Sequence, residues 1–153
     1  LNRAQIIRRP ATFTLPTTQF QITPPAEFGT HATLVGYDLR QEGATLQLSL
    51  TWQILQPLLP PHHIFIHLYD AVGNRIAQSD GDPMTAAGRA PSGSWLPGEY
   101  LTTQHTLTVP ENAQAPFTAQ MGLYNPATGQ RLPVTINGAS SGDSATISLP
   151  TAP

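Results

Sequence analysis

Three aspartates lie around one stretch of the chain, and their type and spacing are the first feature that could support chemistry. Asp70 follows the run "HHIFIHLY", and Asp80 and Asp82 are the next acidic residues along the chain. Paired carboxylates act as general acid and base in glycosidases, and together with loop carbonyls they coordinate Ca²⁺. Their spacing does not match an EF-hand loop. A simpler interpretation makes Asp70 a turn residue and lets Asp80 and Asp82 accept hydrogen bonds from loop amides.

These carboxylates suggest two kinds of site. Asp70, Asp80 and Asp82 are the candidate metal ligands, and Ca²⁺ is the ion that such an oxygen-only set favours. Glu99, which ends the turn "PGE", would join Asp70 and Asp80 in a glycoside hydrolase-like enzyme. In the interpretation that we favour, the protein is not an enzyme, no residue is catalytic and no cofactor is required.

Histidines form a second group in the sequence. His63 and His67 share one face of a predicted strand, His62 is adjacent, and the aliphatic residues between them face the core. A zinc site needs further ligands, and His31 and His105 are candidates, although no spacing selects them. A polar strand face exposed to solvent explains the same pattern without a metal.

Aromatic side chains are the third candidate for binding, because rings on a concave face stack on sugar rings. Tyr69 and Tyr100 are the better exposed candidates, and Trp95 lies in a loop. Arg75 lies in the turn after Tyr69, and its guanidinium forks to a carboxylate or a carbonyl. Tyr69, Trp95, Tyr100 and Arg75 are therefore the predicted ligand-binding residues. The alternative is that these rings pack in the core or at its edge.

Composition and missing motifs exclude several other classes of function. The chain has no Cys, which excludes disulfides, thiolate metal sites and Cys nucleophiles. Lys is absent, all seven basic residues are Arg and the net charge is −2, so nucleic acid is not an expected partner. No G-x-S-x-G nucleophile elbow occurs, and "GNR" and "GQR" are turns rather than phosphate-binding loops.

The elements that must position these residues are strands. Residues 44–56 contain neither Pro nor Gly, and Leu46, Leu48 and Leu50 alternate with polar residues, as in a half-buried strand. Residues 31–40 and this strand form a hairpin about the turn "QEG". Further strands are predicted near residues 62–70, 75–80, 99–110, 117–125, 131–136 and 144–150. Eight or nine strands predict an all-β fold, an antiparallel two-sheet β-sandwich of the jelly-roll or immunoglobulin-like type.

One turn motif occurs twice. "LYDAVGNRIAQ" (residues 68–78) parallels "LYNPATGQRLPV" (residues 123–134), with an Asp or Asn, a Gly and an Arg in the same order. Asp and Asn start turns by hydrogen bonding to nearby backbone, and Gly supplies a positive φ. We expect two equivalent hairpins, one on each sheet, whose arginines Arg75 and Arg131 each reach a carboxylate or a carbonyl.

A long irregular segment, residues 77–101, separates two predicted strands. It exceeds what a hairpin needs, and in a sandwich such a connection crosses from one sheet to the other. We expect Trp95 to fold over the open end of the core while its indole N–H donates to a loop carbonyl.

Length and segment boundaries indicate one domain. The chain has 153 residues. Residues 1–27 are a lead-in with a first strand near "ATFTL", and residues 28–150 form the sandwich. No apolar run approaches the ~20 residues that span a bilayer, so we expect no direct membrane insertion of this fragment. The start lacks an initiator Met and an apolar signal-peptide core, and we expect a piece of a longer protein.

Several motifs in a fixed order carry a resemblance to a known family. They are "LVGYDL", "LQLSLTWQ", "IFIHLYDAVGNRIAQSDGDP", "PSGSWLPGEY" and "MGLYNPATGQRLPV". This set resembles the C-terminal extracytoplasmic β-sandwich domain of bacterial, Chloroflexi-type multi-spanning glycosyltransferase-like membrane proteins, which are similar to the dolichyl-phosphate-mannose-type mannosyltransferases. The similarity runs from about Phe28 to Leu149. One departure is "LTTQHTLTVP", which has no acidic residue near Thr102 or Thr103 and so puts an ion bound there in doubt.

The resemblance implies an extracytoplasmic domain tethered in cis to a membrane enzyme, whose transferase chemistry belongs to its membrane part. It carries no catalytic residue over to this chain. We therefore expect a non-catalytic accessory module, with the parent membrane protein as its partner and a glycan as its ligand. Two alternatives stay open. One is a purely structural or protein-interaction domain without a ligand, and the other is the hydrolase-like enzyme described above.

Overall fold

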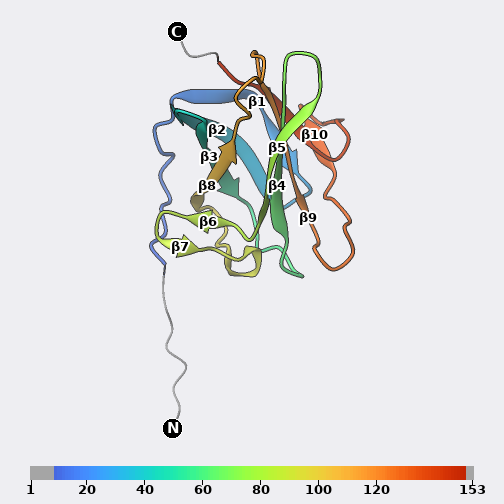
Figure 1. Ribbon diagram of the computed structural model, residues 1–153. Coiled ribbons are helices and arrows are strands. Elements are labelled where there is room, and N and C mark those ends of the chain that lie inside the picture. The colour runs from blue at the N-terminus through green and yellow to red at the C-terminus, as the bar shows by residue number, and fades with distance from the viewer. Residues whose placement is uncertain (1–8, 151–153) are drawn as a thin grey trace.

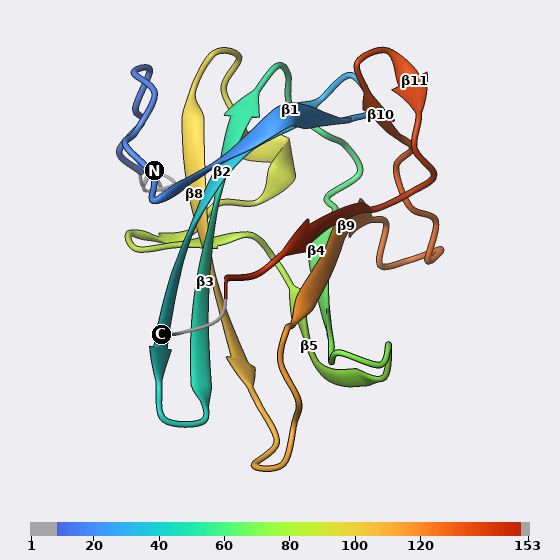
Figure 2. The ribbon, with the colours of Figure 1, turned by 90° about the horizontal axis from the view of Figure 1, so that it is seen from above.

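Two antiparallel sheets pack face to face in the computed structural model, which describes residues 9–150 (Figure 1). The large sheet has the strand order β11-β10-β1-β2-β3-β8, and the small sheet has the order β12-β9-β4-β5. Figure 2 shows β2, β3 and β8 on one side of the molecule and β4, β5 and β9 on the other. The predicted all-β, two-sheet β-sandwich is confirmed.

The described chain contains twelve strands and one short 3₁₀ helix. The large sheet consists of β1 (Phe20–Phe28), β2 (Ala32–Glu42), β3 (Thr45–Ile54), β8 (Tyr100–Thr108), β10 (Val134–Ile136) and β11 (Ala139–Ser140). The small sheet consists of β4 (His63–Tyr69), β5 (Arg75–Gly81), β9 (Thr118–Tyr124) and β12 (Ala145–Ser148). A ribbon of β6 (Met84–Thr85) and β7 (Gly88–Arg89) precedes the 3₁₀ helix η1 (Ser92–Ser94). The predicted number of strands was lower because β6, β7 and β11 are too short to produce an alternating pattern.

Alternating side chains of β3 form one wall of the core. Leu46, Leu48 and Leu50 are at most 2% exposed, as their alternation with polar residues predicted. Trp52 continues the same row, is fully buried and packs edge-on against Phe28, with ring centroids 5.1 Å apart. The opposite wall comes from the small sheet and includes Ile64, Ile66, Leu68, Ala119, Met121 and Leu123.

The first strand begins later than the sequence predicted. The segment "ATFTL" forms only an isolated bridge, in which the Tyr100 N–H donates to the Thr12 carbonyl at 2.7 Å. β1 lies between β10 and β2, and both of its prolines fall where its register with β2 shifts. Proline has no N–H to donate to the hydrogen bonds between strands, and the irregular stretch interrupts the alternating pattern from which a strand is predicted. The sandwich therefore begins at Phe20, inside the predicted lead-in of residues 1–27.

The long segment after β5 crosses from the small sheet to β8 of the large sheet, as predicted. Trp95 is 1% exposed, and its Nε1–H donates to the Ala90 carbonyl at 2.9 Å. This arrangement is the predicted lid over the core. Ser92 anchors the crossing, because its Oγ donates to the Leu58 carbonyl and accepts the His62 N–H, both at 2.8 Å.

The two copies of the turn motif form similar turns, but both lie on the small sheet rather than one on each sheet. Asp70 Oδ1 accepts two backbone N–H groups of its turn at 2.8 and 3.1 Å, and Asn125 Oδ1 accepts one at 2.9 Å. The first turn joins β4 to β5, whereas the chain after the second turn makes one bridge between Tyr124 and Arg131. It then continues into β10 of the large sheet, so the second hairpin is incomplete.

Candidate ligand-binding face

The outward side of the small sheet collects aromatic and hydrogen-bonding side chains. β4 buries Ile64, Ile66 and Leu68 against the core, as predicted, so that its alternate residues point the other way. We call this side, with the loop residues that cover it, the outer face. It comprises His63, Phe65, His67, Tyr69, Arg75, Gln78, Asp80, Asp82, Gln120, Tyr124, Arg131 and Asp143.

Strand pairing brings residues of β5 and β9 to this face, because directly opposed residues of antiparallel strands point the same way. The pairs are Phe65 with Asp80, His67 with Gln78 and Gln120, Tyr69 with Arg75, and His63 with Tyr124. Two of the predicted ligand-binding residues, Tyr69 and Arg75, are therefore cross-strand neighbours.

A stack of three residues forms the centre of the outer face. Phe65 is only 2% exposed although it points outward, because the Arg131 guanidinium carbon lies 4.1 Å above its ring centroid. Below the ring, a Cβ on Gly122 would come within 2.5 Å of Phe65 Cε2, so the close approach requires glycine. Arg131 Nη1 also lies 3.3 Å from the Asp143 carboxylate. Arg131 thus reaches a carboxylate, as predicted, and offers a flat cation at the surface.

Hydrogen bonds within the protein hold Tyr69 in place. Its hydroxyl donates to Gln120 Oε1 at 3.1 Å, and Gln120 Nε2 in turn donates to Ser144 Oγ at 2.8 Å. These two hydrogen bonds fix both the Tyr69 ring and the Gln120 amide before any ligand binds. Pre-ordered side chains lose less conformational entropy on binding.

An ion-pair group lies at the β4 start of the outer face. His63 Nε2 is 3.3 Å from Asp82 Oδ1, and Arg89 Nη2 is 2.5 Å from the other oxygen of the same carboxylate. The His63 ring also contacts Tyr124 edge-on, with centroids 5.7 Å apart. Asp82 therefore pairs with the Arg89 cation and holds the His63 ring in place, a role that a free acid–base residue would not have.

The electrostatic environment of His67 is set by burial, by two charges on β5 and by Arg131 in the segment after β9. Partial burial lowers the pKa of His67, the Arg75 charge lowers it further, Asp80 opposes the shift, and Arg131 adds to it. Burial also raises the pKa of Tyr124, with a smaller contribution from the Asp80 charge. At neutral pH His67 is therefore an uncharged imidazole that both donates and accepts hydrogen bonds.

Asp70 lies at the tip of the β4–β5 hairpin and acts as a turn residue. Hydrogen bonds from the Asn74 backbone, and then from the backbone of Val72, lower the pKa of the Asp70 carboxyl. Within residues 9–150 no three His, Asp or Glu side chains are grouped closely enough to hold a metal ion. The geometry therefore gives no support to Asp70, Asp80 and Asp82 as a calcium site, because Asp70 and Asp82 are committed to other partners.

Trp95 and Tyr100 do not join the outer face. The Trp95 indole is buried beneath the crossing segment, so it has no free face on which a sugar could stack. Tyr100 begins β8 of the large sheet, where it pairs with Gln53 and with the lead-in at Thr12. We therefore remove both residues from the candidate site and keep Tyr69 and Arg75.

Glu99, the third carboxylate of the hydrolase hypothesis, is fully buried. Its two oxygens accept hydrogen bonds from Arg9 at 2.6 and 2.5 Å, and Oε2 also accepts the Leu96 N–H at 2.7 Å. The bidentate pair fastens the lead-in to the crossing segment. A carboxylate in this position is structural, and it has no access to a substrate.

A second buried network occupies the inner side of β8. Trp52 Nε1–H donates to Thr103 Oγ1 at 3.0 Å, and Thr103 Oγ1 lies 2.7 Å from His105 Nε2. Burial lowers the pKa of His105 to about 4. His105 is thus a neutral core residue on the other sheet from His63 and His67, and it is not their zinc partner.

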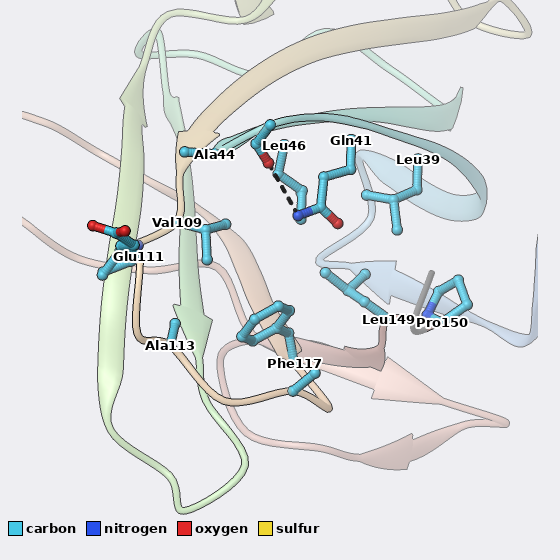
Figure 3. Close-up of a pocket in the computed structure, with 13 residues that line it drawn as sticks. Leu39, Gln41, Ala44, Leu46, Val109, Glu111, Ala113, Phe117, Leu149 and Pro150 are labelled. Carbon is cyan, nitrogen blue, oxygen red and sulfur yellow. Dashed lines mark hydrogen bonds between the residues drawn. The ribbon is translucent and has the colours of Figure 1, made fainter. Parts of the chain in front are cut away.

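An apolar cavity of about 590 Å³ lies at the end of the sandwich, between the β2–β3 turn and the β8–β9 connection. Figure 3 shows Leu46, Val109, Phe117 and Leu149 pointing toward one another around it. None of the predicted site residues lines this cavity. Binding sites usually add convergent polar groups to such an apolar wall, and we therefore place the candidate site on the outer face.

The predicted set of ligand-binding residues did not include Gln120, Tyr124, Arg131 or the stacked Phe65. The signals were present, since Phe65 shares the β4 face of Tyr69 and the second turn motif contains Tyr124 and Arg131. What the sequence did not contain was the pairing of β9 with β4, which is a contact between distant segments.

Comparison with known proteins gives no match, since no family model, curated protein or solved structure matches the chain. Among the residues that the structure describes, none belongs to a helix long and apolar enough to cross a membrane.

Proposed function

We propose that this chain is a non-catalytic accessory module that binds carbohydrate through the outer face of the small sheet. The observation that supports the proposal best is the presence of Tyr69 and Tyr124 on one sheet face, among side chains already oriented by partners within the protein. Sugars combine apolar C–H faces with hydroxyl groups, so they bind best where rings and hydrogen-bonding groups alternate.

The spacing of the two rings favours an oligosaccharide over a single sugar. Tyr124 is opposite His63, and Tyr69 lies six residues further along β4. At about 3.4 Å per residue the rings are about 20 Å apart along the strand. Between them lie the neutral His67, the amides of Gln78 and Gln120, and the flat Arg131 guanidinium. A glycan chain laid along β4 would meet all of these groups.

The wider assignment rests on the sequence resemblance. The proposed partner is a multi-spanning, glycosyltransferase-like parent protein in cis, and the proposed location is outside the cytoplasm. In such a protein the transfer reaction would belong to the membrane part, while this module would hold a glycan acceptor or product near it. The pair of Arg9 and Glu99 ties the lead-in at residue 9 to the body of the domain.

Glycan-array binding by the folded domain tests the proposal. The wild type should bind at least one class of oligosaccharide, and Tyr69→Ala and Tyr124→Ala should each reduce that binding at least tenfold. Tyr69→Phe keeps the ring but removes the hydrogen bond to Gln120, and it should have a smaller effect. Tyr100→Ala, on the other sheet, is the matched control and should bind like the wild type.

The array also separates the alternatives. If the folded wild type binds no glycan, the proposal fails and an interaction domain without a sugar ligand is favoured. If the protein hydrolyses chromogenic glycosides and Asp80→Asn abolishes that activity, the module is an enzyme and the non-catalytic assignment is wrong. Circular dichroism of each variant confirms that the sandwich is intact.

A further inference from the structure

A second concave surface lies on the opposite side of the molecule, on the outward side of the large sheet. It has a volume of about 370 Å³ and is lined by Gln19, Asp38, Leu39, Arg40, Gln47, Ser49 and Gln104. Six of these seven residues have polar side chains, drawn from β2, β3, β8 and the segment before β1. We call this concavity the glutamine pocket. Nothing in the function proposed above uses it.

The three glutamine amides of this pocket are oriented by bonds to their oxygen atoms. Gln19 Oε1 accepts the Leu39 N–H at 2.7 Å. Gln47 Oε1 accepts the Thr106 hydroxyl, and Gln104 Oε1 accepts the Ser49 hydroxyl, each at 3.0 Å. Each bond fixes which end of the amide faces the protein, so the NH₂ end faces away from it.

The pocket is therefore rich in unused donors. Among the described residues, none of the three glutamine Nε2 groups has a hydrogen-bond partner, which leaves six N–H donors around one concavity. One strong acceptor accompanies them, since Asp38 uses Oδ1 to accept the Gln19 N–H at 2.8 Å and keeps Oδ2 unpaired within the described chain. Such a set matches a ligand with many oxygen atoms that accept from amides and a hydroxyl that donates to a carboxylate.

Charge restricts the ligand further. The Asp38 carboxylate within the pocket repels an anion, while Arg40 at the rim is paired with Glu42 at 3.1 Å. The local charge thus disfavours an acidic ligand. A neutral polyhydroxylated molecule satisfies both the donors and the acceptor without placing a second negative charge beside Asp38.

We propose that the glutamine pocket is a second binding site, which takes a neutral sugar through the amides of Gln19, Gln47 and Gln104 and the Asp38 carboxylate. This site is independent of the outer face, since it lies on the other sheet and shares no residue with it. A module with sugar sites on both sheets would bind two glycan chains, or two parts of one branched glycan.

NMR titration of uniformly ¹⁵N-labelled protein tests this site, with maltose, cellobiose and mannobiose as neutral probes and glucuronate as the anionic control. At least one neutral disaccharide should shift the side-chain NH₂ signals of the three glutamines in a saturable manner. Glucuronate should shift them less at the same concentration. Gln104→Leu and Gln47→Leu should each weaken the affinity by about three- to tenfold, as expected for one lost hydrogen bond.

Gln53→Leu is the matched control, because Gln53 is on the outward side of the same strand as Gln47 but does not line the pocket. It should leave the titration unchanged. The proposal is overturned if no neutral disaccharide shifts the three amide pairs, if glucuronate binds more tightly, or if Gln104→Leu and Gln47→Leu bind like the wild type. Tyr69→Ala should bind the disaccharides normally here, which separates failure of this site from failure of the outer face.

Discussion

Acid should destabilise this protein through a single histidine of its core, His105. The imidazole lies on the inner side of β8, is 7% exposed and contacts the Thr103 hydroxyl, which also accepts the Trp52 indole N–H. Trp52 N–H occupies an acceptor site of Thr103, so the Thr103 hydroxyl proton is available to His105 Nε2. Protonation of that nitrogen would replace an acceptor by a donor in a buried site.

The expected loss of stability follows from the two pKa values of His105. Burial lowers the pKa from 6.5 to about 4 in the folded protein, whereas the unfolded chain retains the ordinary value. Above pH 6.5 both states are neutral, and His105 makes no pH-dependent contribution. As the pH falls from 6.5 to 4 the unfolded state binds the proton first, so the free energy of unfolding decreases by about 3 kcal/mol in total. Below pH 4 both states are protonated and this contribution stops changing.

Urea unfolding of the wild type and of His105→Gln at pH 7, 5.5 and 4.5 measures this effect. Glutamine keeps an amide within reach of Thr103 but does not titrate, and every other titrating group is common to both proteins. The difference between the two free energies of unfolding should shift in favour of the variant by about 2–3 kcal/mol between pH 7 and pH 4.5. A difference that stays constant over this range would refute the reasoning.

Three further perturbations test the packing that supports the candidate site. Arg9→Met should lower the free energy of unfolding in urea by about 3–5 kcal/mol, because it removes the cation that pairs with the fully buried Glu99 carboxylate. A decrease below about 1 kcal/mol would contradict this role of the Arg9–Glu99 pair. Gly122→Ala should cost about 1–3 kcal/mol, because the new Cβ would lie 2.5 Å from the Phe65 ring; an unchanged Tm would count against the central stack. Trp95→Phe should cost about 1–3 kcal/mol, because it leaves a buried carbonyl without its donor; calorimetry showing wild-type stability would argue against the lid.

Local patterns were sufficient to predict the sandwich and most of its strands. The alternation around Leu46, Leu48 and Leu50 predicts which side of β3 faces the core, because successive side chains of a strand point to opposite sides. The burial of Trp95 over the end of the core was also predictable, since a large ring among loop residues needs an apolar surface to cover. The position of β1 could not be predicted, because its two prolines lie in an irregular stretch where the register with β2 shifts.

The candidate site was only partly predictable, because it depends on which strands become neighbours. Tyr69 and Arg75 come from one hairpin, and a local turn motif places them opposite each other. Tyr124 and Gln120 reach the same face only because β9 pairs with β4 across more than fifty residues of sequence. The repeated turn motif was a correct signal of similar local structure, but it contained no information about which sheet each copy would join.

The most direct test of the central claim is chemical-shift mapping of the labelled wild-type domain with neutral and acidic oligosaccharides. If the outer face binds glycan, at least one oligosaccharide should shift backbone amides of β4, β5 and β9 around Tyr69, His67 and Tyr124 in a saturable manner. If no oligosaccharide shifts these amides while the spectrum remains that of a folded domain, the outer face is not a carbohydrate-binding surface.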